Sequence, residues 1–518
     1  MKKSKTAFVI LTSMFFLLLF QFSLVGSDYL HTQGNKIVDA NGREVWLTGI
    51  NWFGFETNNN AFHGIWARDL KDVLNQIADL GFNIIRIPLY AELVQTWRAG
   101  NPAAPGSINF YQMNEYLEGL NSLEILDVTV DYCEQIGLKI MFDMHSIGAG
   151  TYMDNLWYTG AFSTQDLINV WVWLADHYKG DDVVIAFDLK NEPHGAYSQG
   201  DNRAIWDDST KTNNWRKAAE DIGKAVLAAN PELLVLVEGI QCYPKFEEGK
   251  NWDSKTEPDY YNTWWGGCLR GVKDYPINLG SGQNRLVYSP HEYGPGVYPQ
   301  PWFEGNFTMD SLLTNLWRPN WFYLFEENSF PLLIGEWGGY LDGGNNEKWM
   351  RILRDFIVQH KIHHTFWCLN PNSGDTGGIL ENDWTTVSTA KYQIVEQALW
   401  QDAGGRYVGL DHEVILGSRG TNVTAYYQGS TNPPTATRTA TVTRTPTRTP
   451  TSTTGQLLGD ANGDGVVNIV DALIIAQCFV GITICEYNTV MDVNRSGTVD
   501  IVDALMVAQY AVGLITGF

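Results

Sequence analysis

The sequence predicts an α/β protein, a (β/α)8 barrel of the TIM type, followed by a small all-α domain. Short apolar stretches alternate with amphipathic helical stretches between residues 45 and 400. Two glutamates, Glu192 and Glu336, each lie where one of the apolar stretches ends. A short internal repeat follows in residues 456–518, beyond a segment rich in threonine and proline.

Eight apolar segments are expected to form the strands of the barrel. They are residues 45–51, 82–88, 138–143, 182–189, 233–238, 285–291, 331–336 and 364–369. Segments with helical spacing of apolar residues lie between them, at 68–80, 119–136, 164–178, 213–229 and 346–359. This alternation within residues 28–403 agrees in length and pattern with a (β/α)8 barrel that carries loop insertions.

Two of the predicted strands lead to a carboxylate. Residues 182–189 run into Asn191, Glu192 and Pro193, and because proline cannot extend a β-ladder, Glu192 is expected at the strand tip. The strand 331–336 ends in Glu336 in the same way. Either glutamate alone could be the polar end of a strand. Together, at the C-terminal face of a barrel, they are the acid and the nucleophile or base that glycosidic bond cleavage requires.

The N-terminus and the charge indicate where the protein works. Residues 1–27 have the pattern of a secretory signal peptide, with three early lysines and an apolar run over 7–19 that is too short for a membrane anchor. The mature protein is therefore expected to be secreted and extracellular, without a membrane partner. A net charge of −23 argues against a nucleic-acid partner, because little positive charge is available to neutralise phosphates.

Export permits disulfide bonds, and the chain has six cysteines. Fifteen pairings are possible, and the sequence does not choose among them. Cys242 and Cys268 are expected to form a disulfide that closes a long loop, and Cys478–Cys485 would close a short one. Cys133 and Cys368 fall within a predicted helix and strand and are expected to be free and buried.

A linker separates the barrel from the C-terminal repeat. Residues 404–431 are glycine-rich and without clear periodicity, and residues 432–455 repeat threonine, arginine and proline. The second segment is expected to be extended, since it has almost nothing to bury. Residues 404–455 are therefore predicted to be a tail and linker, and residues 456–518 a separate domain.

The C-terminal repeat contains two metal-binding loops at an offset of 32 residues. Oxygen donors at loop positions 1, 3, 5, 9 and 12, a backbone carbonyl at 7 and glycine at 6 are the spacing that binds Ca²⁺. The predicted ligands are Asp460, Asn462, Asp464, Val466, Asn468 and Asp471 in the first loop and Asp492, Asn494, Ser496, Thr498, Asp500 and Asp503 in the second. Two Ca²⁺ ions are expected. A calcium sensor is not expected, because a threonine/proline linker stands where a first helix should enter the first loop and because the chain has an export signal.

Residues 456–518 resemble a dockerin, the duplicated calcium-binding module that docks secreted enzymes onto cohesin domains of a scaffold protein. The resemblance implies a cohesin as partner. It also implies that loop positions 10 and 11 choose that partner, and here they are Ile469, Val470, Ile501 and Val502. These residues differ from the Ser-Thr pairs of many dockerins.

Residues 28–403 resemble a glycoside hydrolase family 5 endoglucanase, in the motifs at 49–57, 191–194, 289–293 and 366–380. The resemblance implies no catalytic cofactor and a β-glucan substrate. It makes Glu192 the acid/base and Glu336 the nucleophile of a retaining reaction. The implied substrate-binding and supporting residues are Arg86, which holds the nucleophile, His145, Asn191 for the 2-hydroxyl, His291, Tyr293 and Trp367 as sugar platform.

Aromatic side chains at loops and strand ends are further candidates for stacking on sugar rings. They are Trp52, Trp157 and Trp265, besides Trp367. The same two glutamates would also serve a β-mannanase or a xylanase, and these alternatives remain open. A non-catalytic carbohydrate-binding subunit is a third alternative, although a pure binding protein needs neither an acid nor a nucleophile.

Overall fold

The computed structural model describes residues 27–150, 153–429, 458–461, 467–479, 488–496, 498–511 and 515. The expected signal peptide, apart from Ser27, and the threonine/proline linker lie outside these residues. The described chain divides into two compact units, one on each side of the linker.

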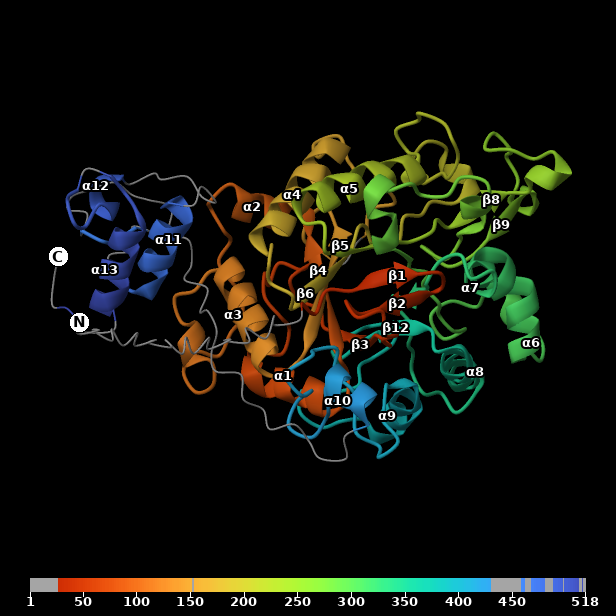
Figure 1. The fold of residues 1–518 in the computed structure, drawn as a ribbon. Helices are drawn as coiled ribbons and strands as arrows, with labels where there is room; N and C mark the ends of the chain where they lie inside the picture. Colours follow the sequence, from red (N-terminus) through yellow and green to blue (C-terminus); the bar gives the residue numbers. More distant parts are fainter. Residues whose placement is uncertain are drawn as a thin grey trace, which may run out of the picture. The chain divides into compact units, whose positions relative to one another are not determined.

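The first unit is a barrel of eight parallel strands, as predicted (Figure 1). The strands are β3 (Thr48–Asn51), β4 (Ile84–Tyr90), β5 (Lys139–Ser146), β6 (Val184–Asp188), β7 (Leu234–Val237), β10 (Leu286–Tyr288), β11 (Leu333–Ile334) and β12 (His363–Phe366). Their order around the sheet is β10-β7-β6-β5-β4-β3-β12-β11, and a parallel bridge between Tyr288 and Leu332 joins the two ends. All eight predicted strands are therefore present, and their bounds differ from the predicted ones by up to three residues at each end.

Helices surround these strands (Figure 1). The longer ones are α1 (Leu70–Asp79), α2 (Ala91–Arg98), α3 (Ser122–Gln135), α4 (Thr164–His177), α5 (Trp215–Ala229) and α8 (Asn345–His360). Polar caps start several of them, such as Asp69, which accepts hydrogen bonds from the backbone of Lys71 and Asp72. Helix α2 was not predicted, because it begins directly at the end of β4 without a turn signal.

Elements between the main strands and helices close the rest of the unit. They are the hairpins β1–β2 (His31–Gln33, Lys36–Val38) and β8–β9 (Cys242–Pro244, Tyr260–Asn262), α6 (Met309–Leu312), a π-helix (Leu313–Phe322), α7 (Tyr323–Glu326), α9 (Thr389–Val395) and α10 (Val423–Gln428). The segment that the sequence left without structure belongs to this unit, since Val408, Leu410, Leu416 and Val423 are buried in its core.

A buried ion network ties the two ends of this unit to the N-terminal end of the barrel. Lys139, the first residue of β5, places Nζ 2.5 Å from Asp28 Oδ2 and 3.1 Å from Asp411 Oδ2. His412 lies between two carboxylates, with Nδ1 2.5 Å from Asp28 Oδ1 and Nε2 3.1 Å from Asp39 Oδ2. Asp28, Lys139 and Asp411 are almost completely buried. The segment after residue 403 is thus held to the barrel by ion pairs as well as by apolar packing.

The predicted disulfide between Cys242 and Cys268 was wrong. Both side chains are free and buried, and each sulfur has its own partner, the Gly195 carbonyl oxygen at 3.4 Å and Asn320 Oδ1 at 3.8 Å. Cys133 and Cys368 are free and buried, as expected. Cys478 is disulfide-bonded, and its expected partner Cys485 lies outside the described residues.

The second unit has three described helices, α11 (Ile469–Phe479), α12 (Asn488–Met491) and α13 (Ile501–Ala511). Helices α11 and α13 are the two repeat copies, and they pack against each other around Ile475 and Val507. This all-α arrangement agrees with the prediction. Among the described residues of both units, no helix combines the length and apolar character needed to cross a bilayer.

Candidate active site

Glu192 lies beyond the strand that leads to it. Strand β6 ends at Asp188, so the prediction that Glu192 occupies the strand tip was wrong by four residues. Its backbone is left-handed, with φ of 51°, a conformation that few residues other than glycine adopt. The turn brings Glu192 Oε1 to 3.0 Å from Nδ1 of His291, which follows β10. Its carboxyl group is buried at the C-terminal face of the barrel.

Glu336 follows β11 and faces the same space. Arg86 Nη1 donates to Glu336 Oε1 at 2.8 Å, and the Tyr293 hydroxyl donates to Oε2 at 2.6 Å. His291 Nδ1 lies 3.6 Å from Glu336 Oε2. One oxygen of Glu192, one oxygen of Glu336 and a ring nitrogen of His291 all lie within 4.8 Å of one another. The structure therefore brings the two glutamates together, as the sequence predicted.

The surroundings shift the pKa values of the two carboxyl groups in opposite directions. Burial, supported by the negative charge of Glu336, raises the pKa of Glu192 to about 7, against the hydrogen bond from His291. Burial alone would also raise the pKa of Glu336, but the positive charges of His291 and Arg86 hold it below its ordinary value. Near neutral pH one group can hold a proton while the other is ionised, which is the division of roles between an acid and a nucleophile.

Arg86, in β4, is fully buried beneath the two glutamates. Besides Glu336, it donates to Asp188 Oδ2 at 2.9 Å and to Asn191 Oδ1 at 2.9 Å. Asp143 and Glu238 lie within ion-pair distance as well, at 3.1 and 3.4 Å from Nη2. Arg86 thus sits among four carboxylates, one of them Glu336.

The remaining predicted pocket residues gather at the same end of the barrel. His145 stacks on Trp367, with ring centroids 5.6 Å apart, and its Nδ1 lies 2.7 Å from Asp143 Oδ2. Burial alone would lower the pKa of His145, but the Asp143 carboxylate raises it. Asn191 is fully buried, and its oxygen is already bound by Arg86. Trp367 is half-buried and retains surface for a ligand.

Trp52 does not belong to this pocket. The prediction that it binds substrate was wrong, because its ring is fully buried, stacks on Phe62 at 3.9 Å and donates through Nε1 to the His63 carbonyl oxygen. Trp157 is fully buried too. Trp265, in contrast, is 40% exposed and stacks on His194 at 3.8 Å, with the rings nearly parallel.

Three buried carboxylates of the site were missed as functional candidates: Asp143, Asp188 and Glu238. Each lies in or directly after a barrel strand, at the same height as Arg86. The signal was present, since the predicted strand 233–238 ends in Glu238 as the others end in their glutamates. This position alone did not identify Glu238 as functional, because strands also commonly end in a carboxylate that has no role in the site.

The calcium loops are described in part. In the second loop, the fully buried Asp503 accepts from the backbone of Asn494 at 3.1 Å and of Asp500 at 2.9 Å, which turns its carboxylate into the loop. Asp471 does the same in the first loop, through the backbone of Ala461 and Asn468. Asn462, Asp464 and Val466 lie outside the described residues. An inward carboxylate at position 12 and alternating oxygen donors before it fit Ca²⁺.

Both units match known families. Residues 38–373 match the cellulase family, glycosyl hydrolase family 5, and residues 458–511 match the dockerin type I domain. Endoglucanase G from Acetivibrio thermocellus is 46% identical over 490 residues, which cover 84% of this chain and 86% of the relative. An endoglucanase from Paenibacillus polymyxa is 39% identical, over 76% of this chain and 94% of the relative.

Solved structures with the same barrel are also similar in sequence. The endocellulase from Pyrococcus horikoshii is 38% identical, with a TM-score of 0.63 over 71% of this chain and 98% of that chain. The catalytic domain of the major endoglucanase from Xanthomonas campestris pv. campestris is 33% identical, with a TM-score of 0.62 over 71% of this chain and 99% of that chain.

Proposed function

Because the chain belongs to glycosyl hydrolase family 5 and carries a dockerin type I domain, we propose that it is a secreted, retaining endo-β-1,4-glucanase carried on a scaffold. The relatives above are named endoglucanases, and the endocellulase from Pyrococcus horikoshii has been solved with cellotetraose. The observation that carries the mechanism is the pair of adjacent carboxyl groups with oppositely shifted pKa values.

In this mechanism Glu336, ionised and held by Arg86 and Tyr293, attacks the anomeric carbon and forms a glycosyl ester. Glu192 gives its proton to the departing oxygen, and then takes a proton from the water that hydrolyses the ester. The spacing of the carboxyl oxygens, within 4.8 Å, supports retention, because an inverting pair stands about 6.5–9.5 Å apart to admit a water. Trp367 and Trp265 retain exposed ring surface on which glucose units could stack.

Two measurements test this function. Hydrolysis rates on cellulose, mannan and xylan side by side should be highest on cellulose, and a higher rate on either of the others would replace the glucanase assignment. Proton NMR of a cello-oligosaccharide digest should show the β-anomer of the new reducing end first. An α-anomer appearing first would mean inversion and would exclude the covalent intermediate.

The pH dependence should follow the two glutamates. The acid must be protonated, so kcat/KM on a soluble β-glucan should fall as pH rises through about 7, the pKa of Glu192. The nucleophile must be ionised, so the rate should persist below the ordinary pKa of a glutamate before it declines, since the pKa of Glu336 is lowered. A decline with rising pH that begins near pH ~4.3, where an unperturbed glutamate ionises, would contradict this assignment of the acid.

The dockerin is proposed to bind two Ca²⁺ ions and a cohesin. Ile469, Ile501 and Val502, which stand at the expected partner-choosing positions, are 56%, 53% and 47% exposed. Leu473 and Leu505, one turn further along α11 and α13, are 56% and 55% exposed, so the repeat presents two similar apolar surfaces. Apolar side chains held outward on a packed helix pair are suited to a protein partner.

Removal of calcium should affect the dockerin alone. Chelation should abolish cohesin binding and the helical circular dichroism of isolated residues 456–518, because the loop carboxylates repel one another without the metal. Hydrolysis of soluble β-glucan by the full chain should not change. The Asp471→Asn/Asp503→Asn variant should reproduce the loss of binding without chelator. A fall in hydrolysis on chelation would instead indicate a metal requirement in the barrel.

A further inference from the structure

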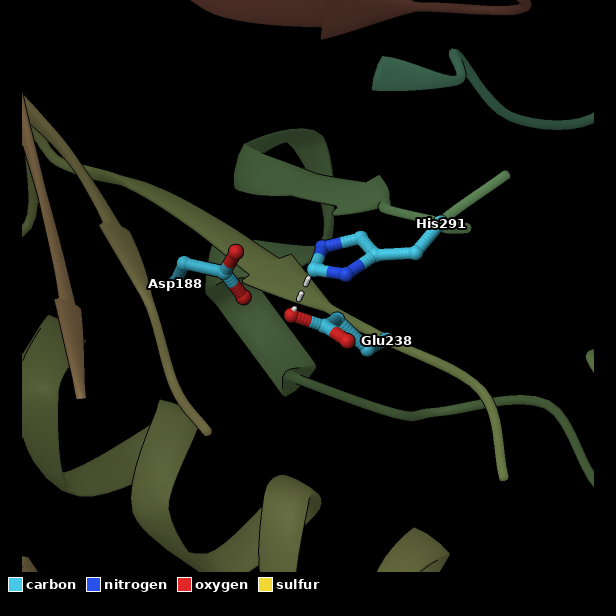
Figure 2. A group of neighbouring side chains, drawn as sticks. All are labelled: Asp188, Glu238 and His291. Atoms are coloured by element: carbon cyan, nitrogen blue, oxygen red, sulfur yellow. Dashed lines mark ion pairs between the residues drawn. The ribbon is translucent and has the colours of Figure 1, made fainter. Parts of the chain in front are cut away.

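Glu238 is a fully buried carboxylate with contacts to several groups of the site. It follows β7, and Figure 2 shows it between His291 and Asp188. Its Oε2 accepts a hydrogen bond from the backbone N–H of Glu192 at 2.8 Å. Its Oε1 lies 3.1 Å from Nε2 of His291 and 3.4 Å from Nη2 of Arg86. Because Glu238 has no exposed surface, it cannot touch the substrate itself.

Two of these contacts converge on Glu192. The first binds the amide of a residue whose left-handed backbone is strained and must be held by its surroundings. The second is an ion-pair contact, 3.1 Å from Nε2 on the far side of the imidazole, whose Nδ1 lies 3.0 Å from the Glu192 carboxyl group. Gly266 closes the same corner, since a Cβ there would lie 2.2 Å from Glu238 Oε2. The backbone and the side chain of Glu192 are therefore both fixed through one carboxylate.

We propose that Glu238 is the positioning residue of Glu192, aligning its carboxyl group for proton donation to the leaving group. This inference rests on the proposed function, in which Glu192 is the acid. Glu238 acts through the Glu192 amide and through His291, and no bond to it forms or breaks during the reaction.

The charges around His291 explain why Glu238 rather than its neighbour has this role. The imidazole is faced by Glu192, Glu238, Glu336 and Asp188, with Arg86 close by. Burial, and then the charge of Glu238, raise the pKa of Asp188 well above its ordinary value. Burial alone would lower the pKa of His291, but Glu238 and then Glu336 raise it well above its usual range. Of the two neighbours, Glu238 is also the one whose Oε1 lies 3.1 Å from the imidazole Nε2.

The test is the sensitivity of the Glu238→Gln variant to the leaving group. Dinitrophenolate is a good leaving group and departs from dinitrophenyl cellobioside without a proton. The leaving groups of phenyl cellobioside and of cello-oligosaccharides need a proton from the acid. We expect kcat/KM to change little with dinitrophenyl cellobioside and to fall on the order of 10²-fold with phenyl cellobioside, a part of the 10²–10⁴-fold that a general acid supplies. Loss of fold alone would lower both rates equally.

Glu292→Gln is the matched control, because Glu292 is also buried and adjacent to His291 but bonds to Trp321. It should lower both rates by the same factor. Glu192→Gln is the reference for an absent acid. If Glu192→Gln discriminates between the two substrates and Glu238→Gln does not, the positioning role is overturned and the proposed function stands. If Glu192→Gln does not discriminate between the two substrates, the positioning role and the proposed function are both overturned.

A second variant covers the case in which Glu238→Gln does not fold. Glu238→Asp keeps the charge and shortens the reach to the Glu192 amide. It should also lose more rate with phenyl cellobioside than with dinitrophenyl cellobioside. Equal losses with the two substrates, in a variant whose thermal melt shows that it is folded, would overturn the positioning role.

Discussion

The Glu336→Ala variant should lose about 10⁶-fold in kcat on cello-oligosaccharides, the size of the loss when a hydrolase is deprived of its covalent nucleophile. Without this carboxylate the protein supplies no nucleophile to the anomeric carbon, and Arg86 and Tyr293 are left without their common partner. The measurement is the initial rate of reducing-sugar release, together with a thermal melt to show that the barrel remains folded.

Added azide separates the roles of the two glutamates. In Glu192→Ala, substrates with good leaving groups should still form the glycosyl ester, and azide should restore turnover as a β-glycosyl azide. In Glu336→Ala, azide can enter only from the face that the nucleophile vacated and should give the α-anomer. The opposite pairing of variants and anomers would show that the assignments of Glu192 and Glu336 must be exchanged.

Replacing Lys139 by methionine should lower the free energy of unfolding of the catalytic unit by about 3–5 kcal/mol, the cost of leaving buried carboxylates without their cation. Asp28 and Asp411 lie 2.5 and 3.1 Å from its Nζ, and both are almost completely buried. The network is at the end of the barrel opposite the glutamates, so activity at low temperature should be unchanged. Thermal and denaturant unfolding of the catalytic unit measure the effect.

Two further variants show whether the loss comes from charge. Lys36→Met removes an exposed pair with Glu44 and should change the free energy of unfolding by less than about 1 kcal/mol. Adding Asp411→Asn to Lys139→Met should recover part of the loss, because one unpaired charge disappears. If the double variant is less stable by the sum of its single effects, the ion network is not what holds the tail.

The sequence was sufficient for features that depend on local patterns. All eight strands were predicted, because parallel strands in a barrel are continuous apolar runs bounded by polar residues. Glu192 and Glu336 were found for the same reason, each following such a run. The helices α1, α3, α4, α5 and α8 were found by their spacing of apolar residues.

Other features depend on contacts between distant residues and could not be read from a local pattern. Trp52 lies in the segment 49–57, one of those on which the expected family resemblance rested, yet its ring turns into the core against Phe62. The tail after residue 403 shows no periodicity because it packs through single residues and through Asp411 and His412. Cys242 and Cys268 were paired on loop length alone, which says nothing about the direction of their side chains.

The bond between Asp28 and His412 joins residues 384 positions apart, and this constrains the order in which the catalytic unit can fold. During synthesis the strand that begins at Lys139 emerges long before Asp411, its C-terminal counter-ion. The first barrel strand, β3, must also wait for the last, β12. Since such long-range contacts form slowly, the native barrel cannot be completed until nearly the whole unit has left the ribosome. For a chain that is expected to be exported, this delay keeps the polypeptide in the unfolded form that a translocation channel accepts.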